Sequence, residues 1–266
     1  MYWVHPSVSG RIVSAWLLTV KVFAVLSLAM LAGKIEASDL PSGVTTEIQL
    51  EKAKRPRLRV SCGHPKRSSY RKRRGVMSFT LEHGDIGRCY TDKPAYFPSG
   101  PVPFMERAEL YSDFRDVGPR YRFSALVHMG PASETAPDTT VFQVHQWVQE
   151  SCRCEPPVML GFDGGGQLKA WVLSAPNTHV EIPLKGWGRE DFETKWVEIA
   201  VDVTSAYGKQ NVTVWLGGHK VLSRNALIQN GGALFLKVGL YRPGSRKARL
   251  PTDRLHVRDV QIGVLH

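Results

Sequence analysis

The chain has 266 residues, of which 42% are hydrophobic and 22% charged, and its formal net charge is +11. This length allows one large domain, because all-β domains often reach such a size undivided. The positive charge is uneven: residues 1–76 carry 14 Lys and Arg against 4 Asp and Glu, whereas residues 77–266 carry 21 against 20. The composition therefore excludes a uniformly basic protein and predicts a nearly neutral globular body behind a basic N-terminal stretch.

The first 37 residues have the pattern of a secretory signal. Arg11 and Lys21 precede the apolar run 22–32, and Ala37 ends a short stretch that suits cleavage. We expect cleavage of the segment 1–37 and export, so that the protein is secreted or periplasmic. The alternative is an uncleaved membrane anchor, but Lys21 interrupts the apolar residues and the uninterrupted part is shorter than the roughly 20 residues of a spanning helix.

Residues 38–75 form a basic arm, in which Lys and Arg cluster in the runs 52–59, 66–67 and 71–74. Such clusters attract polyanions, nucleic acid included. A solvated and partly disordered arm is the expected structure. Nucleic acid is not the expected partner, because the export signal places the chain outside the cytoplasm and no recognition helix or aromatic stacking motif accompanies the charges.

Four cysteines, Cys62, Cys89, Cys152 and Cys154, allow up to two disulfides in an exported chain, with three connectivities. A bond between Cys62 and Cys89 would join the basic arm to the first strands and leave the other two as a vicinal-type pair or as free thiols. One intervening residue between Cys152 and Cys154 is not the spacing of a zinc site, and no second Cys or His pair lies at a matching distance. No metal site is expected.

From Val76 onward, short runs rich in β-branched and aromatic residues alternate with Gly, Pro, Asn and Asp, which predicts strands joined by turns. Ten strands are expected: 76–82, 106–112, 121–128, 140–148, 158–162, 168–173, 196–203, 212–216, 234–241 and 255–262. Asp163-Gly164-Gly165-Gly166 predicts a hairpin turn. The stretches 84–105 and 174–194 show no strand pattern and are expected to be loops that line a cleft. Residues 76–266 are thus predicted to form an all-β domain, a two-sheet antiparallel β-sandwich of the concanavalin A-like jelly-roll type.

Three of these strands carry polar residues at alternate positions. Residues two apart lie on the same face of a strand, so the members of each set face one way. The sets are Arg107 with Glu109, Gln143 with His145, and Lys237 with Gly239 and Tyr241. The opposite faces are apolar and are expected in the core: Leu110, Phe142, Val144, Leu236, Val238 and Leu240. A guanidinium, an amide, an imidazole, an ammonium and a phenol on one sheet would hold and deprotonate an anionic sugar.

Each set also has an ordinary structural explanation. Arg107 with Glu109 is the pattern of a cross-strand ion pair. Gln143 and His145 suit a wetted sheet face, and Tyr241 suits a half-buried sheet aromatic. The occurrence of all three sets in chain order, with matching faces, favours a catalytic site.

The same segments resemble motifs of the jelly-roll polysaccharide lyases, in particular the heparin lyase I-like group, which is related to glucuronan and alginate lyases. Glu106-Arg107-Ala108-Glu109-Leu110 resembles their Arg-x-Glu-Leu strand, and Gln143-Val144-His145 resembles their Gln-x-His strand. Lys237-Val238-Gly239-Leu240-Tyr241 resembles their Lys-x-Gly-x-Tyr strand, and residues 74–85 resemble the strand and turn that precede the first motif. The resemblance covers roughly Arg74 to Ile262.

The resemblance implies a lyase that cleaves uronic-acid polymers by β-elimination without a cofactor. The C5 hydrogen of a uronate is barely acidic while the adjacent carboxylate is charged. Hydrogen bonds from Arg107, Gln143 and His145 would neutralise that carboxylate. His145 or Tyr241 would then take the C5 proton, and Tyr241 would protonate the departing glycosidic oxygen.

The same resemblance gives supporting roles to neighbouring residues. Lys237 would tune Tyr241 or bind the substrate, and Arg242 is grouped with it as a substrate-binding residue. Glu109 would orient the guanidinium of Arg107 through a bidentate pair.

The expected partner is an anionic polysaccharide: glucuronan, alginate, a glycosaminoglycan or an exopolysaccharide. The chain is shorter than the larger heparin lyases and has no acidic calcium loop, which argues against heparin. A monomer is expected. The competing interpretation is a non-catalytic module that binds acidic glycans with the same basic face. A glycosidase is not favoured, because no strand carries the paired carboxylates that such an enzyme places about 5 to 10 Å apart.

Overall fold

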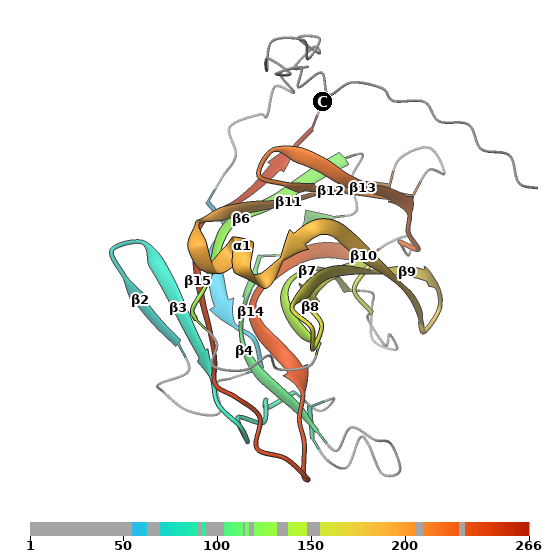
Figure 1. Ribbon diagram of the computed structural model, residues 1–266. Coiled ribbons are helices and arrows are strands. Elements are labelled where there is room, and N and C mark those ends of the chain that lie inside the picture. Colours follow the sequence, from blue (N-terminus) through green and yellow to red (C-terminus); the bar gives the residue numbers. More distant parts are fainter. Residues whose placement is uncertain are drawn as a thin grey trace, which may run out of the picture. The chain divides into compact units, whose positions relative to one another are not determined.

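Two antiparallel sheets lie face to face in the computed structural model (Figure 1). The structure describes residues 55–62, 70–89, 92–93, 104–113, 115–116, 120–131, 138–147, 155–205, 210–228 and 232–265. The segment 1–37, part of the basic arm, and both Cys152 and Cys154 lie outside these ranges, so their predictions stay predictions. Within the described ranges, no helix has the length and apolar character needed to cross a membrane.

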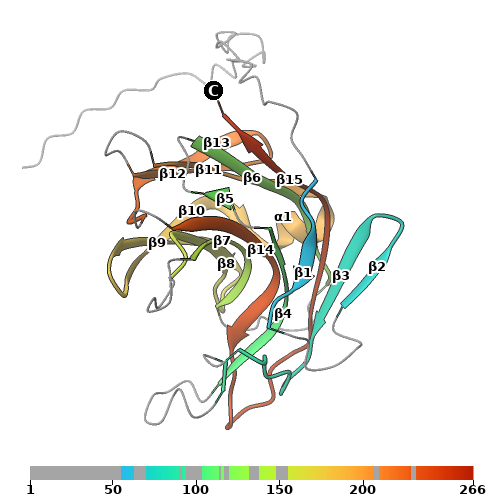
Figure 2. The ribbon, with the colours of Figure 1, turned by 180° about the vertical axis from the view of Figure 1, so that it is seen from behind.

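The first sheet has eight strands. Seven follow the order β1-β4-β14-β7-β8-β9-β10, and the eighth, β5, pairs with β14. Its strands are β1 (Leu58–Val60), β4 (Met105–Ser112), β5 (Arg115–Asp116), β7 (Thr139–Trp147), β8 (Val158–Phe162), β9 (Gln167–Ala175), β10 (Thr178–Gly188) and β14 (Ala233–Pro243). β14 and β4 lie next to each other near its middle (Figure 2).

The second sheet has seven strands in the order β13-β12-β11-β6-β15-β3-β2. They are β2 (Tyr70–Arg73), β3 (Val76–Leu81), β6 (Arg120–Met129), β11 (Val197–Thr204), β12 (Asn211–Leu216), β13 (His219–Asn225) and β15 (Asp253–Val264). One short helix, α1 (Arg189–Thr194), contributes Phe192 to the core, where its ring meets Phe162 edge-on with centroids 5.2 Å apart.

The all-β prediction is confirmed, and all ten predicted strands are present with each end within two residues of the expected one. The hairpin predicted at Asp163 is also confirmed, since β8 and β9 pair across it. The Asp163 carboxylate accepts backbone N–H bonds from Gly165 at 2.9 Å and from Gln167 at 3.0 Å, which closes the turn.

The stretch 174–194 is not the loop that the sequence predicts, because it contains β10 and α1. Val180, Ile182 and Leu184 alternate as a strand requires, but Pro183 lies among them. Proline is compatible with a strand only where no ladder partner needs its missing N–H, and β10 is the last strand of its sheet.

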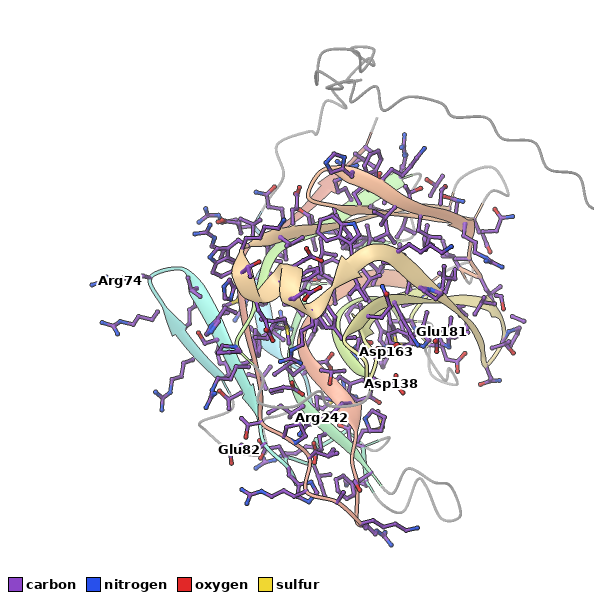
Figure 3. All side chains as sticks on the ribbon, in the orientation of Figure 1. Arg74, Glu82, Asp138, Asp163, Glu181 and Arg242 are labelled. Atoms are coloured by element: carbon purple, nitrogen blue, oxygen red, sulfur yellow. A yellow bond between two sulfur atoms is a disulfide. The ribbon has the colours of Figure 1, made fainter. Side chains whose placement is uncertain are left out.

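Two further hairpins have short turns with positive φ angles. Arg74 and Gly75, with φ of 49° and 81°, join β2 to β3, and Gly217 and Gly218, with φ of 55° and 83°, join β12 to β13. Both central residues of a type I′ hairpin turn need positive φ, which explains the glycines. The turn places Arg74 at the tip of the β2–β3 hairpin, where its side chain points outward (Figure 3).

Part of the predicted basic arm is paired with the sheets. The strands β1 and β2 both precede residue 76, and they pair with β4 and β3, respectively. A disulfide joins Cys62, just after β1, to Cys89, which is the pairing that would attach the arm to the first strands.

The core lies between the sheets, and the predicted core residues on the site strands are all in it. Leu110 is 2% exposed, and Phe142, Val144, Leu236, Val238 and Leu240 are fully buried. The strand faces that carry the three polar sets are therefore the opposite faces, as the alternation predicts.

A buried ion cluster crosses the core side of the fold. The guanidinium of Arg242, fully buried, donates to Glu106 at 2.7 Å, to Asp253 at 2.7 Å and to the Pro251 carbonyl at 2.7 Å. Asp253 also accepts from Arg189 at 2.9 Å. Because these residues come from β4, β14, β15 and α1, the cluster ties the two sheets and the helix together.

Replacement of Arg242 by Met should lower the free energy of unfolding by about 3–5 kcal/mol, because it leaves the Glu106 carboxylate buried without its guanidinium. Urea unfolding followed by circular dichroism measures the loss. Arg246→Met, at an exposed position that follows β14, is the matched control and should change stability by less than about 0.5 kcal/mol. Equal stability of both variants would contradict a structural role for the cluster.

Candidate active site

Strand register brings the three polar sets onto one face of the eight-stranded sheet. Across β4 and β14, Arg107 lies opposite Tyr241 and Glu109 lies opposite Gly239. Across β14 and β7, Lys237 lies opposite Gln143. Directly opposite residues of an antiparallel pair point to the same face, so all five polar side chains share it.

Gly239 allows the strands to approach closely at the centre of this face. Its φ is 142°, and a Cβ atom at this position would lie 2.2 Å from the Ala108 carbonyl oxygen and 2.5 Å from the Glu109 Cα atom. The pairing of β14 with β7 also shifts register between Val238 and Tyr241. Glycine is thus required for packing here, and the irregularity re-aims the side chain of Tyr241.

Arg107 is held by two carboxylates below the surface of the site, and only 4% of it is exposed. Its Nε and Nη2 atoms donate to the two oxygens of Asp92 at 2.9 and 2.7 Å, and its Nη1 atom donates to Glu109. Burial alone would lower the pKa of Arg107, but Glu109, Asp92 and Tyr241 outweigh it and raise that pKa. The guanidinium therefore stays charged and has a fixed orientation.

Glu109 connects this cation to the next strand. One of its oxygens accepts from Arg107, and the other accepts from the Gln143 amide nitrogen at 2.5 Å. Three of the five guanidinium N–H groups and one of the two amide N–H groups are used in these bonds. Among the described residues, the remaining two N–H groups of Arg107 and one of Gln143 have no protein acceptor.

Tyr241 lies directly over Arg107. The guanidinium carbon is 4.2 Å from the centroid of the phenol ring, which is a cation–π contact. Tyr241 itself is half-buried.

His145 has a defined tautomer. Its Nδ1 atom lies 3.0 Å from the carbonyl oxygen of Gln146, and a carbonyl only accepts, so Nδ1 carries the hydrogen. Burial, followed by the positive charge of Lys237, lowers the pKa of His145 well below its ordinary value. The imidazole is therefore neutral at pH 7, with a lone pair on Nε2, and its ring stacks on Phe235 with centroids 4.9 Å apart.

Lys237 and Tyr241 are both half-buried, whereas Arg107, Glu109 and Gln143 lie beneath them. The Nζ atom of Lys237 is 5.8 Å from the Phe235 ring centroid, on the ring that also stacks with His145. The site therefore has a buried layer, formed by Arg107, Glu109 and Gln143, and a half-buried layer, formed by His145, Lys237 and Tyr241.

Two residues correct the expectation from sequence. Arg242 was expected to bind substrate, but it lies on the core face of β14, fully buried in the ion cluster with Glu106 and Asp253. Its position next to Tyr241 already implied the opposite face. Asp92 was not predicted at all, although it supplies the bidentate contact to Arg107 that was expected from Glu109.

Among the described residues, no group of three or more His, Cys, Asp or Glu side chains is placed to hold a metal ion. The site presents a neutral imidazole, a phenol, an ammonium and an oriented guanidinium.

No protein-family model matches the sequence, and no curated protein matches it. Several solved structures match the fold. The alginate lyase A1-II', a member of polysaccharide lyase family 7, has a TM-score of 0.55 and 12% identity, over 76% of this chain and 86% of that one. An alginate lyase from Pseudomonas aeruginosa has a TM-score of 0.54 and 16% identity, over 75% and 87%. At such identities the likeness shows the fold alone, a two-sheet jelly roll.

The pKa of His145 should lie below 6.5 in a nuclear magnetic resonance titration of its ring protons. Lys237→Met should raise that pKa toward the ordinary value, because it removes the positive charge that lowers the pKa most while burial remains. Lys220→Met, an exposed lysine on β13, is the matched control and should leave it unchanged. An unchanged titration of His145 in Lys237→Met would show that the two charges do not interact.

Proposed function

We propose that the protein is a polysaccharide lyase that cleaves a uronate-containing anionic polysaccharide by β-elimination. The observation that carries the proposal is the single sheet face on which a neutral imidazole with a free Nε2 lone pair, a phenol over a guanidinium, and an ammonium come together. Binding of a glycan alone would need no such proton acceptor and donor.

Neutralisation of the substrate carboxylate is the first requirement of this reaction. Lys237 supplies a charge that a ligand can reach, and the remaining N–H groups of Arg107 and Gln143 supply oriented donors. Donors fixed before the reaction stabilise negative charge as it develops on the carboxylate of the enolate-like transition state. Asp92 and Glu109 act as positioning residues, because they hold the guanidinium and the amide.

Proton transfer is the second requirement. In the proposed reaction Nε2 of His145 takes the C5 proton, the C4–O bond breaks, and the electron pair of the C5–H bond forms the C4–C5 double bond. Tyr241 gives its hydroxyl proton to the departing glycosidic oxygen. The guanidinium of Arg107 beneath the ring stabilises the phenolate that results.

The solved structures support the substrate class. One neighbour, a family 7 alginate lyase A1-II' with a His replaced by Asn and a Tyr replaced by Phe, is in complex with the substrate GGMG. It has a TM-score of 0.56 and 12% identity, over 76% of this chain and 84% of that one. The choice among alginate, glucuronan, a glycosaminoglycan and an exopolysaccharide depends on contacts that the shared fold does not set. Specificity for heparin has no support from these neighbours.

A panel of uronate polymers tests the activity directly. β-Elimination creates an unsaturated uronate, whose ultraviolet absorbance rises with each cleavage. Absorbance growth on at least one polymer, and none on a neutral glucan, is the expected result. Tight binding of a uronate polymer with no absorbance change across the panel would instead show a glycan-binding module.

Tyr241→Phe should lower kcat by about 10² to 10⁴ on the polymer that the unaltered protein cleaves, because it removes one proton donor. Folding should be unaffected, since the ring remains over Arg107. Tyr121→Phe, in β6 of the other sheet, is the matched control and should keep full activity. Near-normal turnover in Tyr241→Phe would remove the phenol from the mechanism.

Arg107→Lys should also lower kcat strongly although it keeps the positive charge. An ammonium cannot bond both oxygens of Asp92 and reach Glu109 at the same time. The reaction on carboxyl-reduced polymer reports the same interaction from the substrate side, and it should be slow with the unaltered protein. If the reduced polymer were cleaved as fast as the native one, carboxylate neutralisation would be the wrong account.

A further inference from the structure

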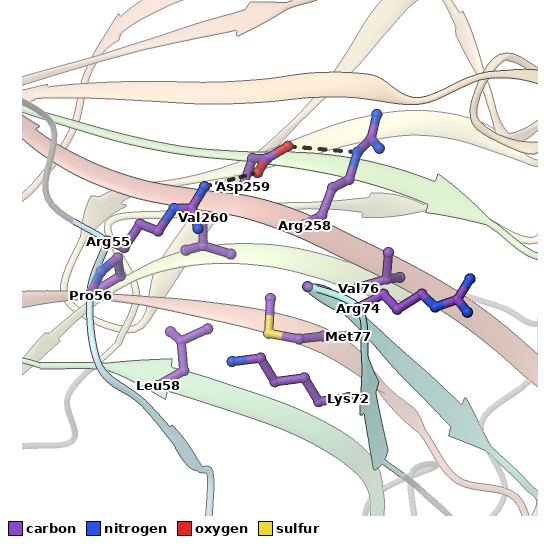
Figure 4. A pocket seen from close by; sticks show the side chains of 11 residues that line it. Arg55, Pro56, Leu58, Lys72, Arg74, Val76, Met77, Arg258, Asp259 and Val260 are labelled. Carbon is purple, nitrogen blue, oxygen red and sulfur yellow. Dashed lines mark ion pairs between the residues drawn. The ribbon is translucent and has the colours of Figure 1, made fainter.

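A second pocket lies at the edge where the two sheets meet, away from the candidate active site. β1 of one sheet, the β2–β3 hairpin and the bend in β15 of the other enclose a volume of about 360 Å³ (Figure 4). Small-molecule sites span about 300 to 1,000 Å³, so the pocket is large enough for a small ligand or one segment of a polymer. Its floor is apolar and is formed by Leu58, Val76, Met77 and Val260.

The rim of this pocket is cationic. Arg55, Lys72, Arg74 and Arg258 line it, and Asp259 is the one carboxylate among the lining residues. Figure 4 shows Asp259 between two of the arginines, at 3.8 Å from Arg55 and 3.7 Å from Arg258. Four cations against one carboxylate leave the lining with a formal charge of +3.

Lys72 and Arg74 have no ion-pair or hydrogen-bond partner for their side chains among the described residues. Both are exposed: Lys72 belongs to β2, and Arg74 is the first residue of the turn that joins β2 to β3. Arg258 differs from them, because its guanidinium stacks on Trp196 with the carbon atom 4.5 Å from the ring centroid. The hairpin thus presents two unpaired cations over an apolar floor.

An acidic sugar combines the two properties that this pocket accepts. Its ring offers a C–H face to an apolar floor, and its carboxylate or sulfate meets cations on the rim. Sites for single-stranded nucleic acid typically offer aromatic side chains on which bases stack, and the pocket lining contains none. The chemistry of the pocket therefore favours an acidic glycan over a nucleic acid.

Strand register connects the pocket to the candidate active site. Arg59 of β1 lies opposite Tyr111 of β4, which lies opposite Lys237 of β14. Adjacent strands are about 4.8 Å apart, so Arg59 is roughly 10 Å from the Lys237 row on the same face. A polyanion bound at Lys237 and extended across β4 would meet Arg59 at the sheet edge, next to the pocket.

We propose that this pocket is a second binding site for the acidic polysaccharide, which retains long chains while another segment occupies the active site. The proposal rests on the proposed function for the identity of the polymer. Two linked sites bind one long chain more tightly than either site alone, whereas a short oligosaccharide cannot occupy both.

The test uses the full chain with the double substitution Lys72→Glu and Arg74→Glu. Isothermal titration with alginate and with polyglucuronate, each as long polymer and as trisaccharide, should show at least tenfold weaker binding of the long chains alone. The loss should shrink as salt is raised. Lys220→Glu with Arg224→Glu, exposed residues on β13, makes the same charge change and should leave binding unchanged.

Kinetics on the polymer that is cleaved should show a raised KM for long chains, an unchanged kcat, and unchanged constants for short ones. The pocket would not be a polysaccharide site if the unaltered protein and the Lys72→Glu, Arg74→Glu variant bound long chains equally. The same conclusion would follow if the unaltered protein bound neither polymer. If a DNA duplex displaced the bound polysaccharide from the protein more strongly than free polysaccharide does, the preferred ligand of the pocket would be nucleic acid and the proposal would be wrong. Pocket-dependent binding without cleavage of any polymer would instead refute the proposed lyase activity and leave the pocket in place.

Discussion

The candidate site depends on the guanidinium of Arg107, which is buried between the carboxylates of Asp92 and Glu109. Burial of three charged groups is costly, and only close pairing with good hydrogen bonds offsets that cost. Two carboxylates and one guanidinium still leave net negative charge under the site. An anionic ligand would be repelled by this layer unless a cation stood above it, which makes the charge of Lys237 a physical requirement for a uronate substrate.

The strand β14 serves two purposes because adjacent residues face opposite ways. Tyr241 contacts Arg107 on the site face, and Arg242 contacts Glu106 and Asp253 on the core face. The residues of β4 repeat this division, with Arg107 on one side and Glu106 on the other. A cation–π contact on the site face and an ion pair on the core face join the same two strands. A slip by one residue would break both contacts and expose the core.

The sequence alone was sufficient for much of this arrangement. Alternation of apolar and polar residues predicted the ten strands and the shared face of Arg107, Gln143 and Tyr241. Alternation does not predict a residue whose role depends on a contact with a distant segment of the chain. Asp92 lies in a segment without a strand pattern, and nothing local shows that its carboxylate meets a guanidinium 15 residues away.

Other misses had a signal that was available. Arg242 was grouped with Lys237 and Tyr241 even though its parity places it on the core side. β10 lies in a stretch where the sequence predicts a loop, but Val180, Ile182 and Leu184 alternate there, and an edge strand tolerates Pro183. The Gly217-Gly218 pair predicts a two-residue hairpin turn and would have indicated β13 after β12. In each case the signal is local: the parity of a residue on its strand, or the residue types of a turn.

Charge placement gives the fold a consequence beyond the reaction itself. The body of the protein is close to neutral, so long-range attraction of a polyanion must come from local groups of cations rather than from the net charge. The β2–β3 hairpin holds one group of cations, Lys72 and Arg74. Lys237 is a further cation, on β14, and the strands β1 and β4 lie between it and the sheet edge at the pocket. A polysaccharide that contacts both the hairpin and Lys237 loses its translational freedom only once, so the second contact costs less entropy than the first. After each cleavage, the end held at the hairpin would remain near the site, because its rebinding is then intramolecular.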